Sequence, residues 1–199
     1  HQEARRQRQM CIRDRIMIAS SIPNFLTVFR FFLVYPIVIS ILEENYQLTL
    51  FFFFLAGISD FLDGYLARKY SWESRFGKIF DPISDKVLVI ATLISLSLVG
   101  EINIYLTMFL LSRDLFIIVG VILSSLLIDN YEIKPYFSGK FNSFVLMTYL
   151  GFVIIEVSFG LVPEVFLNFL MVALLITSLY SVIEYLNYPG RKVISQIFF

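Results

Sequence analysis

The sequence has little charge, a single cysteine and no net charge. Charged residues make up 16% of its 199 residues, and hydrophobic residues make up 58%. A soluble domain carries roughly 25% charged residues, so this composition excludes a water-soluble globule and a disordered chain. Lys+Arg and Asp+Glu number 16 each, so no net field attracts nucleic acid and we expect no nucleic-acid partner. Cys11 stands alone, which excludes an internal disulfide and a cysteine metal site.

Residues 1–15 differ in character from the rest of the chain. They hold five of the sixteen basic residues and no apolar run, so they lack the hydrophobic segment of a secretory signal. They fit either a non-native leader, with Met17 as the native start, or a basic arm that binds anionic lipid. We favour the first and expect 1–16 to be a non-native or disordered leader and 17–199 to be a single domain.

Six apolar segments follow, each long enough to cross ~30 Å of hydrocarbon as a helix. A membrane β-barrel would show alternating segments of ~10 residues, and these segments do not alternate. We therefore expect an all-α integral membrane protein, a bundle of six transmembrane helices with a polar cavity open to the cytoplasmic side. The expected spans are 22–42, 47–68, 77–98, 104–128, 141–159 and 164–185.

The charges of the connecting segments predict an orientation in the membrane. The second and fourth connections and the C-terminal tail carry basic residues, whereas the first, third and fifth connections carry only acids. Because basic loops stay in the cytoplasm, we expect both termini and the second and fourth connections there, at the inner membrane if the source is bacterial. The basic residues are Lys69, Arg75, Lys78, Lys134, Lys140, Arg191 and Lys192, and the acids are Glu43, Glu44, Glu101 and Glu164.

Four aspartates cross from the end of the second expected span into the third. Asp60 and Asp63 share one helical stripe, and Asp81 and Asp85 share another on the next span. Four carboxylates in a low dielectric repel one another, so we expect something cationic between them. Oxygen ligands without His or Cys favour Mg²⁺ or Mn²⁺, and four of them suit two metals that clamp a diphosphate. Helix capping or ion pairs with neighbouring basic residues would explain one or two of these aspartates, but not four.

The spacing D-x2-D-G-x2-A-R-x8-G-x3-D-x3-D resembles the signature of the CDP-alcohol phosphatidyltransferase family of phospholipid-synthesising membrane enzymes. Every fixed position is met, and the resemblance extends through most of the chain from Ile22. It implies a metal-dependent transfer of a phosphatidyl group from CDP-diacylglycerol to an alcohol, with release of CMP. The fixed positions are Asp60, Asp63, Gly64, Ala67, Arg68, Gly77, Asp81 and Asp85.

The same resemblance implies a role for each motif residue. Asp60, Asp63 and Asp81 would bind one divalent cation, and Asp60, Asp81 and Asp85 would bind a second. Asp85 would also be the catalytic base that takes the proton from the attacking hydroxyl. The other four motif residues would line the cytidine-diphosphate site: Gly64, Ala67, Arg68 and Gly77.

The first span contains three further candidates for the nucleotide site. Asn24, Thr27 and Arg30 lie on one face at helical spacing, and members of the family often show this P-N-x-x-T-x-x-R pattern beside the nucleotide. The alternative for Arg30 is that its long side chain extends to the inner membrane interface.

Arg113 and Lys140 are the candidate acceptor-binding residues. Arg113 and Asp114 lie well inside the fourth span, where they could be a neutralising pair or the guanidinium could hold an acceptor phosphate. With Lys140 as a second cation, the arrangement resembles family members that act on glycerol 3-phosphate, the phosphatidylglycerophosphate synthases. Asp114 and Asn142 instead resemble the CMP-forming cardiolipin synthases, whose acceptor is phosphatidylglycerol, so both acceptors stay open and we favour the first.

Two other classes of protein compete with a transferase. An ion carrier would place acids near the midplane on broken helices within inverted repeats, and the chain shows no such repeat. A structural membrane subunit would not hold four buried carboxylates. The expected partners are therefore CDP-diacylglycerol, a glycerol-type acceptor and the lipid bilayer; members of the family commonly form homodimers, which the residues here do not decide.

Overall fold

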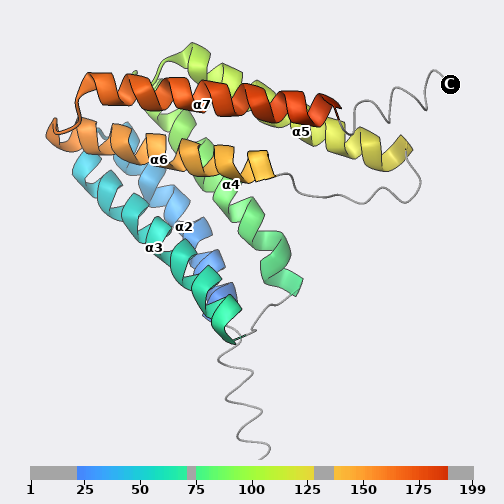
Figure 1. Cartoon of the computed structure of the whole chain (residues 1–199). Helices are drawn as coiled ribbons and strands as arrows, with labels where there is room; N and C mark the ends of the chain where they lie inside the picture. The colour runs from blue at the N-terminus through green and yellow to red at the C-terminus, as the bar shows by residue number, and fades with distance from the viewer. Residues whose placement is uncertain (1–21, 71–74, 128–136, 188–199) are drawn as a thin grey trace, which may run out of the picture. The chain divides into compact units, whose positions relative to one another are not determined.

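The computed structural model describes residues 22–70, 75–127 and 137–187, and within these residues it is entirely helical, without strands (Figure 1). This confirms the expected helical membrane architecture. The helices follow the expected spans closely, with the largest difference at the start of α6. They are α2 (Ile22–Leu42), α3 (Tyr46–Tyr70), α4 (Arg75–Leu98), α5 (Ile104–Leu127), α6 (Phe137–Phe159) and α7 (Glu164–Tyr185).

Five of the described helices are long and apolar enough to cross a membrane, namely α2, α3, α5, α6 and α7. The remaining described helix, α4, has 24 residues, the same number as α5. It carries Asp81, Asp85 and Lys86, and these charges, rather than its length, separate it from the other five. The third expected span, 77–98, therefore coincides with the helix that carries half of the aspartate motif, and its crossing of the membrane stays a prediction.

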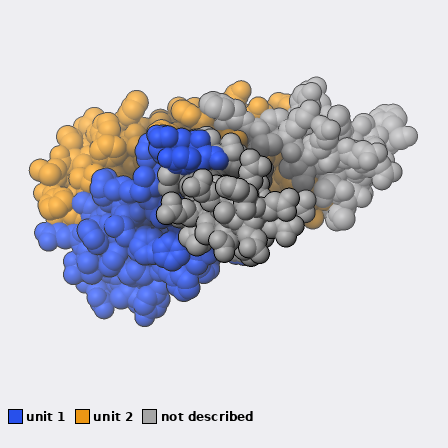
Figure 2. Space-filling view, turned by 90° about the horizontal axis from the view of Figure 1, so that it is seen from below, with its two compact units in different colours: residues 1–92 blue, residues 93–199 orange. Residues whose placement is uncertain are grey.

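The chain divides into two compact units, and the boundary falls within α4 between Thr92 and Leu93 (Figure 2). The first unit contains α2, α3 and most of α4. The second contains the end of α4 together with α5, α6 and α7. The expected leader, residues 1–16, lies outside the described residues.

In the first unit, α2 and α3 pack side by side as an antiparallel pair (Figure 1). Ile37, Ile41 and Ala56 are buried, and the small Ala56 side chain permits close approach between helices. Near the connection between the helices, the Thr49 hydroxyl donates a hydrogen bond to Ser40 Oγ at 2.9 Å. These contacts fix the face of α2 that meets the aspartates of α3.

Large apolar side chains cover much of the outer surface of both units. On α2 and α3, Phe25, Phe32 and Phe61 are each about two-thirds exposed, and Phe51 and Phe54 are also exposed while Phe53 is buried. A soluble protein rarely leaves so many aromatic rings in contact with water. The exposed rings fit contact with lipid.

In the second unit, α7 packs along α6 and also contacts α5. Leu150, Ile154 and Leu174 form the fully buried centre of this packing. The connection between α6 and α7 turns at Gly160, whose φ of 63° is one that glycine adopts without strain. The Glu156 carboxylate accepts a hydrogen bond from the Val162 backbone N–H at 2.6 Å, which closes this turn.

Candidate active site

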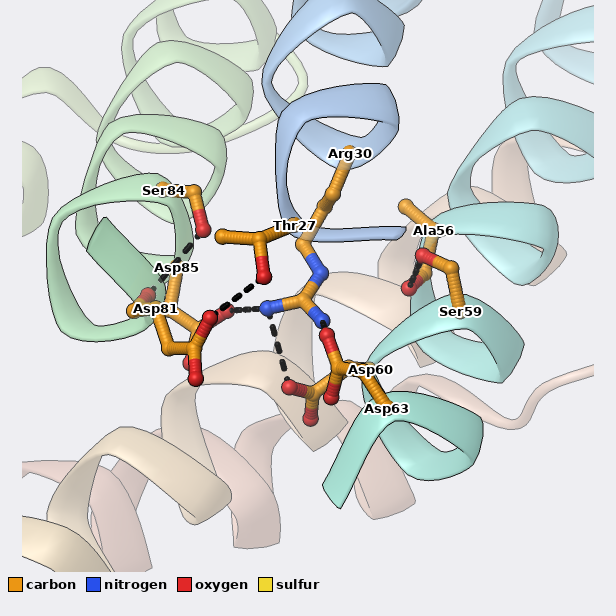
Figure 3. A network of polar contacts seen from close by, with 9 residues as sticks. All are labelled: Thr27, Arg30, Ala56, Ser59, Asp60, Asp63, Asp81, Ser84 and Asp85. Carbon is orange, nitrogen blue, oxygen red and sulfur yellow. Dashed lines mark hydrogen bonds and ion pairs between the residues drawn. The ribbon is translucent and has the colours of Figure 1, made fainter. Parts of the chain in front are cut away.

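All four motif aspartates have a hydrogen-bond or ion-pair partner on α2 (Figure 3). The Arg30 guanidinium contacts three of them: Nη1 contacts Asp60 Oδ1 at 2.9 Å and also Asp85, and Nη2 contacts Asp63. The Thr27 hydroxyl, one turn earlier on the same helix, donates to Asp81 Oδ1 at 2.5 Å. Residues from three helices of the first unit therefore meet at one point.

The expectation of a cation between the carboxylates is met by Arg30, which the sequence reasoning did not connect to them. The Arg30 side chain is 1% exposed, so the alternative that it extends to the membrane interface is wrong. Ion pairs across 30 or more residues cannot be read from helical spacing. The available signal was the cost of a lone arginine in an apolar span, which requires a partner of opposite charge.

The aspartates differ in how far they are open to the surroundings. The Asp63 side chain is 7% exposed, whereas those of Asp60 and Asp85 are 45% and 47% exposed. The Asp63 carboxylate is therefore enclosed with the guanidinium. Asp60 and Asp85 keep an open side on which a substrate or a cation can approach.

Hydroxyl groups near the aspartates form hydrogen bonds within their own helices. Ser59 Oγ donates to the Ala56 carbonyl at 2.7 Å, and Ser84 Oγ donates to the Asp81 carbonyl at 3.0 Å (Figure 3). Both serines are buried, and a buried hydroxyl without a partner would be costly. These two hydroxyls are thus satisfied within their own helices, whereas the Arg30 guanidinium and the Thr27 hydroxyl contact the carboxylates.

The aspartate cluster has the chemistry of a hard-cation site. Four carboxylates around one guanidinium leave an excess of negative charge, and oxygen ligands of this kind suit Mg²⁺ or Mn²⁺. Among the described residues, no three Asp, Glu, His or Cys side chains are grouped closely enough to hold a metal ion. In Figure 3, Arg30 lies between the aspartates of α3 and those of α4. The donor set fits the expected cations, and the metal-binding roles stay predictions.

Most of the expected nucleotide contacts lie where side chains are not described. This applies to Asn24, Ala67, Arg68 and Gly77. Gly64 follows Asp63 on α3 and is partly exposed. Their roles stay predictions, as do those of Thr27 and Arg30 toward the nucleotide.

Arg113 lies in the second unit and is buried between α5 and α7. Its Nη1 contacts Asp114 Oδ1 at 2.5 Å, and its Nη2 donates to Ser181 Oγ at 2.5 Å. Its Nε is buried without a hydrogen-bond partner. The neutralising pair is therefore present, and Nε is the guanidinium nitrogen without a partner. Lys140, in the first turns of α6, is exposed.

Asn142 of α6 links two hydroxyls of α7. Its Oδ1 accepts hydrogen bonds from Thr177 Oγ1 at 2.9 Å and from Ser178 Oγ at 2.8 Å, and its side chain is buried. The sequence reasoning treated this position as a marker of the acceptor and missed its structural contacts. Polar residues in two successive apolar spans were the signal for such interhelical hydrogen bonds.

Replacing Asn142 by leucine is expected to lower the free energy of unfolding by about 1–3 kcal/mol, because the buried Ser178 hydroxyl loses its acceptor. Thermal unfolding of the purified protein in detergent measures the change. Ser143→Ala is the matched control, since Ser143 is exposed and its hydroxyl donates to the Gly139 carbonyl of its own helix. Equal unfolding temperatures for the two variants would contradict a stabilising role for Asn142.

The chain matches the family model described as CDP-alcohol phosphatidyltransferase over residues 20–182. A relative from Aquifex aeolicus, named CDP-diacylglycerol–glycerol-3-phosphate 3-phosphatidyltransferase, is 33% identical over 177 residues, which cover 87% of this chain and 98% of the relative. A protein of the same name from Haemophilus influenzae is 47% identical over 77 residues, 37% of this chain and 42% of the relative.

A second type of relative carries a different name. The CMP-forming cardiolipin synthase of Rattus norvegicus is 31% identical over 193 residues, which cover 89% of this chain and 64% of the relative. The family match includes all of the aspartate motif and, apart from the last three residues of α7, the five helices that can cross a membrane. The chain is an integral membrane protein and belongs to the CDP-alcohol phosphatidyltransferase family.

Proposed function

We propose that this protein transfers a phosphatidyl group from CDP-diacylglycerol to glycerol 3-phosphate and releases CMP. The observation that carries the proposal is the convergence of four motif aspartates on one site in a member of this family. The Aquifex aeolicus relative, matched over nearly its whole length, is named for this reaction. An ion carrier or a structural subunit would have no use for a complete transferase motif.

The proposed reaction is a displacement at phosphorus. The acceptor hydroxyl oxygen attacks the phosphorus that carries diacylglycerol, a new P–O bond forms, and the P–O bond to the CMP phosphate breaks. CMP leaves with the bridging oxygen. We assign the proton of the acceptor hydroxyl to Asp85, whose half-exposed carboxylate can meet an incoming hydroxyl.

Asp60, Asp63, Asp81 and Asp85 would hold two divalent cations, Mg²⁺ or Mn²⁺. Such cations neutralise the charge of a diphosphate and stabilise its leaving group. Gly64, Ala67, Arg68, Gly77, Asn24 and Thr27 would contact the cytidine diphosphate, as the family motif implies. The basic second and fourth connections favour a cytoplasmic position for this site and for both termini.

We assign the acceptor phosphate to Arg113 and Lys140. Arg113 has one unpaired buried donor, and Lys140 is exposed at the start of α6. Arg113→Ala is expected to raise the KM for glycerol 3-phosphate by about 10- to 100-fold, the value of a charged hydrogen bond, with a smaller effect on kcat. Initial rates against acceptor concentration measure this. An unchanged KM would separate Arg113 from the acceptor site.

Phosphatidylglycerol is the second candidate acceptor. Asp114 and Asn142 resemble the pattern of CMP-forming cardiolipin synthases, and the Rattus norvegicus relative carries that name. In this structure Asn142 is committed to hydrogen bonds with α7, so its amide oxygen is not available to bind an acceptor. This observation weakens position 142 as an indicator of the substrate.

The test is CMP release by the purified protein in detergent with CDP-diacylglycerol and Mg²⁺. Glycerol 3-phosphate and phosphatidylglycerol are supplied in parallel reactions, with EDTA as the metal-free control. Turnover with glycerol 3-phosphate supports the proposal, and turnover with phosphatidylglycerol alone supports a cardiolipin synthase. Absence of metal-dependent CMP release with both acceptors would contradict both assignments.

A further inference from the structure

Arg30 is held in the aspartate cluster by its two terminal nitrogens alone. Its side chain is 1% exposed and its Nε is buried without a hydrogen-bond partner. It is also the only charged residue of α2 in the sequence. A lone charge in an apolar span is costly, so the position of the guanidinium depends on the carboxylates that it contacts.

We propose that Arg30 is the internal counter-charge of the site: it holds the aspartates together without metal and competes with divalent cations for Asp60 and Asp85. The proposal rests on the proposed function, because it requires the same carboxylates to bind those cations. Four carboxylates need positive charge among them, and a guanidinium supplies it while fitting several carboxylate oxygens at once.

The exposure of the three partners indicates which contacts give way. Asp63 is enclosed with the guanidinium, whereas Asp60 and Asp85 are nearly half exposed. A cation that arrives on the open side meets Asp60 and Asp85 first. Arg30 then stays on Asp63 and releases the other two. In this role Arg30 is a positioning residue, which acts on the reaction through the aspartates.

The experiment measures Mn²⁺ binding by isothermal titration calorimetry, and thermal unfolding with EDTA or Mn²⁺, on the full chain in detergent. Arg30→Gln is expected to lower the Kd for Mn²⁺ by about tenfold, because a competing positive charge is removed. In EDTA, the unfolding temperature of Arg30→Gln should be lower than that of the wild type. The rise in unfolding temperature on adding Mn²⁺ should be larger for Arg30→Gln than for the wild type. A residue that only fills space would lower both temperatures equally and leave the Kd unchanged.

Two further variants keep the test decisive. Arg30→Lys retains the charge on a single nitrogen, so the rise in its unfolding temperature on adding Mn²⁺ should lie between those of the wild type and Arg30→Gln. If Arg30→Gln does not fold, the comparison of Arg30→Lys with the wild type is the test. Arg113→Gln is the matched control, a buried arginine whose partners are Asp114 and Ser181. It should lose stability without a change in the Kd for Mn²⁺.

The outcomes separate the two proposals. If the wild type binds Mn²⁺ and Arg30→Gln binds it with equal or lower affinity, the counter-charge role is refuted and the proposed function stands. If the wild type binds no Mn²⁺, the metal-dependent function and the role of Arg30 are both refuted.

Discussion

Replacing Asp85 by asparagine is expected to lower kcat by about a thousandfold, the contribution of a general base, and to leave the fold intact. Asparagine has the shape of aspartate but cannot take the proton of the acceptor hydroxyl. In this variant Arg30 keeps its ion pairs with Asp60 and Asp63, so the aspartate cluster stays linked to α2. CMP release measures the loss, and thermal unfolding with Mn²⁺ checks that the protein still folds and binds cations.

Asp60→Asn is the matched control for this variant. Asp60 and Asp85 are similarly exposed and both contact Arg30 Nη1, but we assign the proton transfer to Asp85 alone. Higher Mg²⁺ should therefore restore part of the activity of Asp60→Asn, which has lost only a metal ligand, and should not restore Asp85→Asn, which has lost the base as well. A near-wild-type rate for Asp85→Asn, or its recovery at high Mg²⁺, would remove Asp85 as the base.

The helices and the position of the aspartates could be predicted because both depend on short-range patterns. Long apolar runs set the helix bounds, and steps of three and four residues put Asp60 and Asp63 on one face of α3. A step of four residues likewise put Asp81 and Asp85 on one face of α4. None of these patterns says which face of α2 meets them.

The contacts that the sequence did not reveal all join different helices. Arg30 reaches partners 30 to 55 residues further along the chain, and Asn142 reaches Ser178 on α7. Such pairs depend on the orientation of each helix about its own axis, and packing along the whole length of the helices determines that orientation. The apolar pattern also located α4, but the charges that make the site set this helix apart from the five described helices that are apolar enough to cross a membrane.

Replacing Asp114 by asparagine is expected to lower the free energy of unfolding by about 3 kcal/mol, the lower end for a buried ion pair, because Arg113 is buried while the Asp114 side chain is 22% exposed. The Arg113 side chain is 7% exposed and Asp114 supplies the negative charge beside it. The variant leaves a buried guanidinium with the Ser181 hydroxyl, which is neutral. Thermal and denaturant unfolding in detergent with Mg²⁺ measure the loss.

Removing both charges separates the ion pair from simple packing. In Arg113→Met combined with Asp114→Asn, no buried charge is left without a partner, so this double variant should be more stable than Asp114→Asn alone. Glu43→Gln, which removes an exposed acid in the connection between α2 and α3, should change the stability by less than about 0.5 kcal/mol. If Asp114→Asn behaves like Glu43→Gln, the pair does not stabilise the second unit. Arg113 would then exchange its contact with Asp114 for a contact with a substrate phosphate at little cost in free energy. In that case the effect of Arg113→Ala on KM would reflect direct binding of the acceptor.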